Sequence, residues 1–180
     1  MPRAITATQS HLYFTIDQPV GRNAPNDHFD VLLVQFLLRI ATSGNVDWPT
    51  GSEFYWGPDL DVGTRRPLLT RAAGAPANRL PLALPGMPDG TQISIDGDCG
   101  PQTIQFIEFF QQEMVKRGQK PAVDGQVKPW ANTLTGTMEL LNWALARSSW
   151  GGPRKWNLVS SPGFPQELYK YFYSPWIPFS

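Results

Sequence analysis

Apolar residues follow helical spacing in three segments of the chain, and these segments predict a mainly α fold. Residues 30–41 are apolar on nearly every side, which is typical of a helix that other elements cover. After the first residue of this run, only Gln35 and Arg39 are polar. A buried strand is the alternative interpretation, but the length of the run favours a helix. Asp30, or alternatively Asp27, is suited to cap the helix, because its carboxylate can accept hydrogen bonds from first-turn amides.

A second helix is predicted over residues 101–116, and a third over residues 131–147. Proline suits the first helical position because its missing N–H would have no partner there, and Gly118 is placed to end the second helix. On both helices, apolar residues recur at spacings of three and four. The apolar faces consist of Phe106, Ile107, Phe110 and Met114, flanked by Ile104 and Phe109, and of Leu134, Met138, Leu141 and Leu145.

Three stretches outside these helices have different character. Residues 1–26 are predicted to be an extended lead-in, in which the β-prone residues 11–16 form a short strand. Residues 42–91 are rich in Gly, Pro and Asp and are predicted to be an inserted long loop, which aromatic side chains tie down. Residues 148–180 form an aromatic tail that is too apolar to lie free, so we expect it to pack on the core or on a partner.

The composition fits one globular domain with many loops. The chain has 180 residues, of which 41% are hydrophobic, and it holds 16 glycines and 18 prolines. This length allows a substantial core, and the apolar content argues against disorder. We therefore predict a single domain over residues 1–180, with its three-helix core in residues 27–41 and 92–147 and possible short β structure in the lead-in.

One turn-into-helix motif occurs twice. Its first copy contains Asp96, Gly97, Gly100, Pro101 and Thr103, and its second contains Asp124, Gly125, Pro129 and Thr133. The glycine after each aspartate tolerates a positive φ, the proline favours the following helix, and the threonine hydroxyl can bond local backbone. Gln35 and Gln111 stand on otherwise apolar helices, so they would hydrogen-bond buried loop backbone if they face inward.

The three elements in this order resemble the peptidoglycan-binding-like domain, a small three-helix module of bacterial and phage cell-wall proteins. Besides the two motif copies, the resemblance is carried by Asp30-Val31, Val34-Gln35, Leu37-Leu38, Ile107, Phe110-Gln111, Val127 and Leu134. It covers about half of the chain. The chain departs from the family in the long segment 42–91, the apolar residues Ile104 and Phe109, the lysine at position 128 and the aromatic tail. The insertion, the two apolar residues and the tail predict that the usual outer surface is covered.

The resemblance implies a non-catalytic recognition module that binds peptidoglycan or its fragments and targets or anchors a larger assembly. Aromatic side chains pack well against sugar rings, so the candidate ligand-binding residues are Trp48, Tyr55, Trp56 and Trp130, with core packing as the alternative role of each. A different hypothesis is a structural or adaptor subunit of a phage tail or contractile secretion apparatus. In that case residues 169–180 would dock on a protein partner.

No pattern in the chain indicates catalytic chemistry. The histidines are His11 and His28 and the single cysteine is Cys99, so neither a zinc-ligand spacing nor a supported nucleophile pair is visible. We expect no catalytic residue, no metal and no cofactor. Glu108 and Glu113 are expected to be solvated helix charges. A small cell-wall hydrolase or toxin therefore ranks last among the hypotheses.

Charge and hydropathy limit the partners. The formal net charge is zero and no basic run is present, so a nucleic-acid partner is not expected. No secretory h-region and no run of about 18 apolar residues is visible, so we expect no signal peptide and no membrane span. The expectation is a protein made in the cytoplasm that reaches the periplasm, or joins a particle, by a non-standard route.

Overall fold

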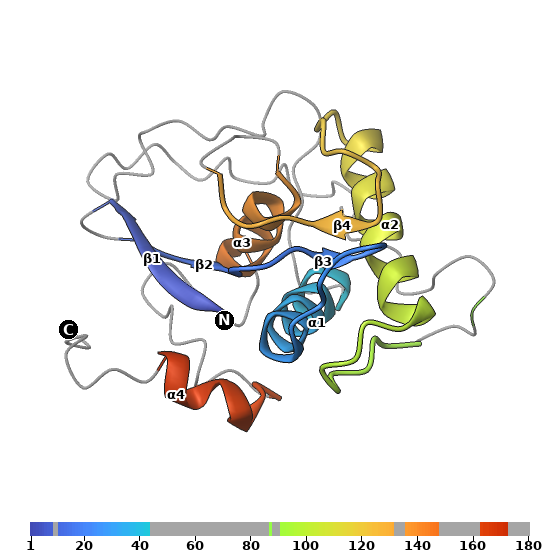
Figure 1. The fold of residues 1–180 in the computed structure, drawn as a ribbon. Coiled ribbons are helices and arrows are strands. Elements are labelled where there is room, and N and C mark those ends of the chain that lie inside the picture. The colour runs from blue at the N-terminus through green and yellow to red at the C-terminus, as the bar shows by residue number, and fades with distance from the viewer. Residues whose placement is uncertain (9–10, 44–86, 88–90, 132–135, 148–162, 173–180) are drawn as a thin grey trace.

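The computed structural model describes residues 1–8, 11–43, 87, 91–131, 136–147 and 163–172. This part of the chain is mostly helical, with two small antiparallel strand pairs beside the helices (Figure 1). The mainly α fold predicted from the hydrophobic pattern is therefore confirmed. Most of the predicted loop 42–91 lies outside the described residues.

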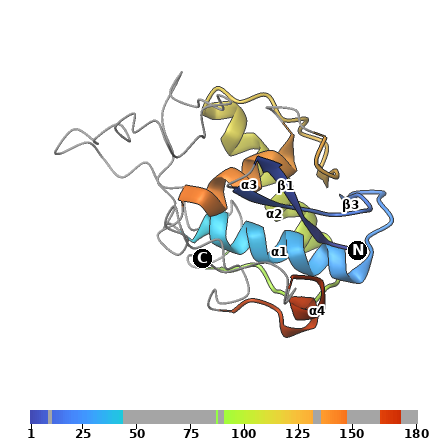
Figure 2. The same ribbon diagram turned by 90° about the vertical axis from the view of Figure 1, so that its left-hand side faces the viewer.

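Helix α1 (His28–Thr42) is the centre of the packing. Asp27 is its N-cap, because the Asp27 carboxylate accepts hydrogen bonds from the amides of Phe29 and Asp30. Asp30, which the sequence favoured as the cap, instead accepts a hydrogen bond from the Gln18 amide at 3.1 Å and ties the lead-in to the helix. As the apolar run predicts, the helix is buried on nearly all sides and contacts both α2 and α3 (Figure 2).

Helix α2 (Pro101–Lys116) has the bounds that the sequence predicts. Gly118 follows its last turn with a φ of +85°, which allows the next amide, that of Gln119, to donate back to the carbonyl of Met114 at 2.9 Å. Phe106, Ile107 and Phe110 are buried in the core on its inner face. Phe109, one of the apolar departures from the family, is only 8% exposed.

Helix α3 (Thr137–Arg147) begins later than predicted, so a start at Ala131 is wrong. The backbone amides that follow Pro129 donate hydrogen bonds to side chains elsewhere in the fold and not to a helical carbonyl. The Trp130 amide donates to the Thr15 hydroxyl at 2.8 Å, and the Ala131 amide donates to the Glu139 carboxylate at 3.1 Å. These bonds hold residues 130–131 outside the helix.

The lead-in contains more β structure than predicted. Strand β2 (His11–Thr15) agrees with the strand expected over residues 11–16, and it pairs antiparallel with β1 (Arg3–Thr8). Strand β3 (Val20–Gly21) pairs antiparallel with β4 (Gln126–Val127). Gly21 is required in β3 because a Cβ atom there would lie 2.0 Å from the carbonyl oxygen of Gly125.

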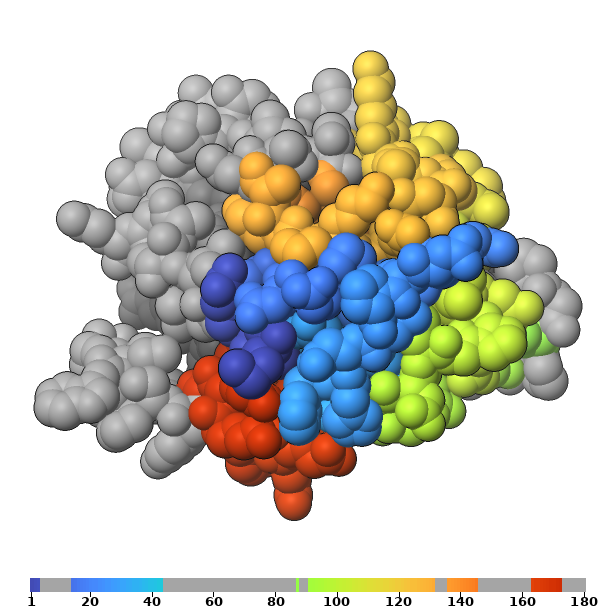
Figure 3. Space-filling view, in the orientation of Figure 1, coloured from blue at the N-terminus to red at the C-terminus, as the bar shows by residue number. Residues whose placement is uncertain are grey.

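The C-terminal arm, defined as residues 163–172, packs back onto the domain. It contains η3 (Gln166–Leu168) and the short helix α4 (Tyr169–Phe172). Phe164, Leu168 and Phe172 recur at every fourth position and are buried. In Figure 3 the arm, in red, lies directly against the N-terminal segment and the start of α1.

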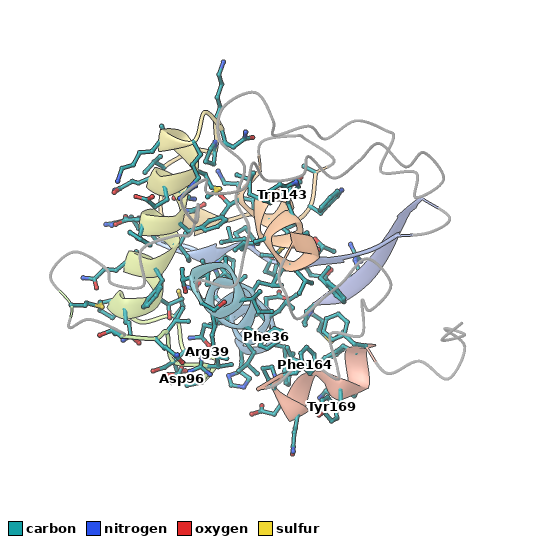
Figure 4. The ribbon with its side chains drawn as sticks, turned by 180° about the vertical axis from the view of Figure 1, so that it is seen from behind. Phe36, Arg39, Asp96, Trp143, Phe164 and Tyr169 are labelled. Atoms are coloured by element: carbon teal, nitrogen blue, oxygen red, sulfur yellow. The ribbon has the colours of Figure 1, made fainter. Side chains whose placement is uncertain are left out.

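Aromatic contacts hold the arm in place. The Phe164 ring meets the Phe36 ring of α1 edge to face at a centroid distance of 5.2 Å, and Figure 4 shows these side chains facing each other between the two elements. The Phe172 ring meets the Phe14 ring in the same manner at 5.3 Å. Such ring pairs contribute about 0.5–1.5 kcal/mol beyond the area that they bury. The described part of the tail therefore belongs to the core.

Replacing Phe164 by alanine should lower the free energy of unfolding by about 3 kcal/mol, because it removes a buried ring and leaves a cavity beside Phe36. Urea unfolding followed by tryptophan fluorescence measures this loss. The matched control is Val123→Ala, at a side chain that is 49% exposed, and it should change the free energy by no more than about 0.5 kcal/mol. An unchanged urea midpoint in the Phe164→Ala protein would show that the arm contributes nothing to the folded core.

Candidate functional site

Buried glutamine Gln35 of α1 holds the first turn, defined as residues 96–98. Its side-chain oxygen accepts the backbone amides of Asp96 at 3.1 Å and Gly97 at 2.9 Å. Its nitrogen donates to the Asp98 carbonyl at 3.0 Å and to the Thr103 hydroxyl of α2 at 3.1 Å. One amide group thus satisfies the turn backbone and joins α1 to the first turn of α2.

Buried Gln111 of α2 does the same for the second turn, defined as residues 124–126. Its side-chain oxygen accepts the Gly125 amide at 3.0 Å. Its nitrogen donates to the Gln126 carbonyl at 2.8 Å and to the Thr137 hydroxyl of α3 at 3.0 Å. Both glutamines face inward, as the sequence analysis required for this role.

The two contacts are structurally equivalent, but the second threonine is not the predicted one. Gly97 and Gly125 take positive φ values of +77° and +68°, as the Asp-Gly motif predicts. Thr103 fills the hydroxyl position in the first contact, and Thr137 fills it in the second. Thr133, which the sequence suggested for that place, lies outside the described residues. The first turn is followed closely by α2 at Pro101, whereas α3 begins only at Thr137, so a later threonine reaches the glutamine.

A third buried amide links the last helix back to the beginning of the domain. The side chain of Asn142 on α3 donates to the Phe14 carbonyl at 2.8 Å and accepts the Phe14 amide at 2.7 Å. Each of α1, α2 and α3 therefore holds a neighbouring backbone segment through one buried amide. No spacing or composition marked Asn142, because its partner is 128 positions away in the sequence.

A hollow of about 140 Å³ lies between the second turn and the start of α3. Its described lining combines small apolar residues with polar ones, namely Ala122, Pro129, Ala131 and Gly136 with Asp124, Gln126, Lys128, Thr137 and Glu139. A Cβ atom at Gly136 would lie 2.0 Å from the Glu139 carboxylate in its present position. The glycine thus permits the Glu139 side chain to fold back over the helix start.

Charge in the hollow is partly balanced. The Lys128 ammonium lies 2.9 Å from an oxygen of Asp124, whose other oxygen accepts the Gln126 amide. Burial alone would raise the pKa of Asp124, but these hydrogen bonds and that from Gln111 outweigh it, so the pKa lies below its ordinary value. Asp124 is therefore ionised at neutral pH, and the lysine has donors left for another group.

The carboxyl group of Asp96 in the first turn is also favoured in its charged form. The amide of Asp98, followed by the side chain of Gln35, lowers the pKa of Asp96 below its ordinary value. The aspartates of both turns thus act as ionised acceptors that shape the turns.

Of the four aromatic candidates from the sequence, the described structure includes Trp130 alone. Trp48, Tyr55 and Trp56 lie outside the described residues. Trp130 is partly buried against the core, and its backbone amide is bonded to Thr15. Its ring is therefore part of the packing, while its neighbours Pro129 and Ala131 line the hollow.

The side chains that could act as nucleophiles or acids are buried or contact other parts of the fold. Burial raises the pKa of the Cys99 thiol, which favours the unreactive protonated form. The His28 ring lies 3.0 Å from Glu167 of the C-terminal arm. Glu108 pairs with Arg22. Glu113 is buried and accepts from Lys116, so its expected role as a solvated charge is wrong.

Within the described ranges, no three His, Cys, Asp or Glu side chains are grouped closely enough to hold a metal ion. No helix in this part of the chain combines the length and hydropathy needed to cross a bilayer. No protein-family model, no curated protein and no solved structure matches the chain.

Replacing Gln35 by leucine should lower the free energy of unfolding by roughly 2–4 kcal/mol, because the buried amides of Asp96 and Gly97 lose their acceptor. Gln111→Leu should cost a similar amount at the second turn. The control Gln105→Leu makes the same exchange at an exposed position of α2. Chemical denaturation of the three variants compares these costs, and equal stability of Gln35→Leu and Gln105→Leu would contradict the assigned role.

Proposed function

We propose that the chain is a non-catalytic module that recognises the peptidoglycan of a bacterial cell wall, as a bacterial or phage component, and targets or anchors a larger assembly. The observation that carries this proposal is the doubled glutamine–turn–threonine contact. The positions that produce it, Gln35 with the first turn and Gln111 with the second, are those through which the sequence resembles peptidoglycan-binding-like domains.

The helix arrangement supports the same proposal. Helix α1 packs against α2 and α3, and each turn leads into the next helix of the series. A three-helix core of the peptidoglycan-binding-like type would have this order. The strand pairs and the C-terminal arm are then additions around that core.

The hollow beside the second turn is a place where the described residues could contact a ligand. It offers a cation at Lys128, acceptors at Gln126 and Glu139, and small apolar walls. Its volume of about 140 Å³ is well below the roughly 300–1,000 Å³ of pockets that enclose a whole small molecule. A site of this size suits one unit of a polymer, and several copies in one assembly would strengthen attachment to a repeating wall.

Purified protein should sediment with insoluble peptidoglycan, and an Ala122→Trp substitution should reduce the bound fraction about fivefold by covering the hollow, a loss of about 1 kcal/mol of binding free energy. Ala122 is exposed, so the larger side chain does not disturb the core. Gln112→Trp, which places the same ring at an exposed position of α2 outside the hollow lining, is the control and should bind as the parent does.

Sedimentation no greater than that of an unrelated protein of similar size would refute the cell-wall role. Sedimentation that is equal for the parent and Ala122→Trp would instead refute the hollow as the place of binding. The two results separate the function from its location.

A second candidate function is a structural or adaptor subunit of a phage tail or contractile secretion apparatus. The C-terminal arm favours it. Among the described residues, the arm is joined to the rest of the chain by one hydrogen bond, between Glu167 and His28, and otherwise by side-chain packing. Its anchors at every fourth residue resemble a helical peptide docked in a groove. Tyr169 on its outer side is 40% exposed.

Deletion of residues 173–180 tests the adaptor function without removing Phe172, which the core requires. If the chain is an adaptor, the shortened protein should keep its helical circular dichroism but should no longer copurify with its particle. Normal assembly of the shortened protein would remove the main support for this role.

A further inference from the structure

We infer that the two glutamine contacts also protect the chain from a spontaneous modification, the conversion of Asp96 and Asp124 to isoaspartate. Each of these aspartates precedes a glycine, and Asp-Gly pairs are prone to this reaction because glycine has no side chain to shield its backbone nitrogen. A third such pair, Asp89-Gly90, lies outside the described residues. The protection is independent of the cell-wall function, because it concerns the survival of the turns and not what the chain binds.

The reaction begins when the glycine nitrogen attacks the side chain of the aspartate before it. The nitrogen gives up its proton and bonds to Cγ, a Cγ–O bond breaks and water leaves, so that a cyclic succinimide forms. Water then opens the ring. When it breaks the bond between the nitrogen and the original backbone carbonyl, the main chain runs through Cβ and Cγ. The net composition is unchanged, and water is the only co-reactant.

The attacking nitrogen is occupied in both turns. The Gly97 amide donates to the side-chain oxygen of Gln35 at 2.9 Å, and the Gly125 amide donates to that of Gln111 at 3.0 Å. Both glycines are buried. Loss of the proton would place a nitrogen anion against the glutamine oxygen, and burial makes such an unpaired charge costly. The hydrogen bond to glutamine therefore opposes the first step.

The aspartate side chains are held in their less reactive state. One oxygen of Asp96 accepts the Asp98 amide at 3.0 Å and the Gln35 side chain at 2.9 Å, and these bonds lower the pKa of Asp96. Burial alone would raise the pKa of Asp124, but hydrogen bonds, including that from the Gln126 amide at 2.9 Å, hold this pKa below its ordinary value as well. An ionised carboxylate loses an oxygen less readily than a carboxylic acid does, so both groups resist attack.

The backbone of both turns is fixed on another side as well. The Gly125 carbonyl accepts the Arg22 amide at 3.0 Å, so this glycine is held through both of its backbone polar groups. A Cβ atom on Gly97 would lie 2.2 Å from the His28 ring, so the first turn packs closely against the start of α1. Ring closure requires the aspartate side chain and the glycine nitrogen to rotate toward each other, and these contacts oppose that rotation.

The experiment incubates the full chain at neutral pH over weeks and measures isoaspartate by peptide mapping. Electron-transfer fragmentation locates each altered residue, because the mass does not change. In the folded parent, Asp96 and Asp124 should convert at least about tenfold more slowly than in the same chain kept unfolded in guanidinium chloride. This comparison needs no variant.

The variants separate the local contact from general stability. Gln35→Leu should accelerate conversion at Asp96 about fivefold and leave Asp124 within about twofold, and Gln111→Leu should do the reverse. Phe164→Ala is the control, because it destabilises the domain away from both turns. It should accelerate neither site by more than about twofold. Circular dichroism verifies that each variant retains its fold during the incubation.

Conversion in the folded parent as fast as in the unfolded chain would overturn the inference. Equal acceleration at both turns in either glutamine variant, or the same acceleration in Phe164→Ala, would also overturn it, since transient unfolding of the whole domain would then control the reaction. Acceleration confined to the turn whose glutamine is missing is the result that supports it.

Discussion

Buried side-chain amides satisfy the backbone of the turns that connect the helices, and the rest of the structure depends on this interaction. A turn placed against an apolar helix loses water from its N–H and C=O groups, and each unpaired group costs about 1–3 kcal/mol. Gln35 and Gln111 replace that water at the first and second turns. Asn142 does so for the backbone of Phe14. Helix α1 can therefore be apolar on nearly all sides while irregular chain packs against it.

This arrangement also explains why the candidate site lies where it does. The second turn is held by the hydrogen bond from the Gly125 amide to Gln111 and by the pairing of β3 with β4. The start of α3 is fixed by Thr137, which shares the same amide. The hollow between them is therefore bounded by backbone that Gln111 holds through hydrogen bonds. Two different elements, brought together by one buried glutamine, form its walls.

Aromatic residues of the C-terminal arm pack into the core of the domain. The tail was expected to pack on the core or on a partner, and residues 163–172 pack on α1 and the end of β2. The pattern of every fourth residue was available in the sequence, but its partners Phe14 and Phe36 were not, because they are separated from the arm by more than a hundred positions. Aromatic rings that could bind sugars or proteins can serve equally well as core, and only their packing distinguishes these uses.

The sequence by itself determined the local features of this protein: an apolar first helix, a second helix that starts at Pro101 and stops at Gly118, and two Asp-Gly turns. These follow from side-chain periodicity and backbone conformational preference, which act over a few residues. Tertiary structure alone decided the start of α3, the choice of Thr137 and the position of the hollow. Those features depend on which distant groups satisfy the amides of Trp130 and Ala131, and local propensity contains no information about them.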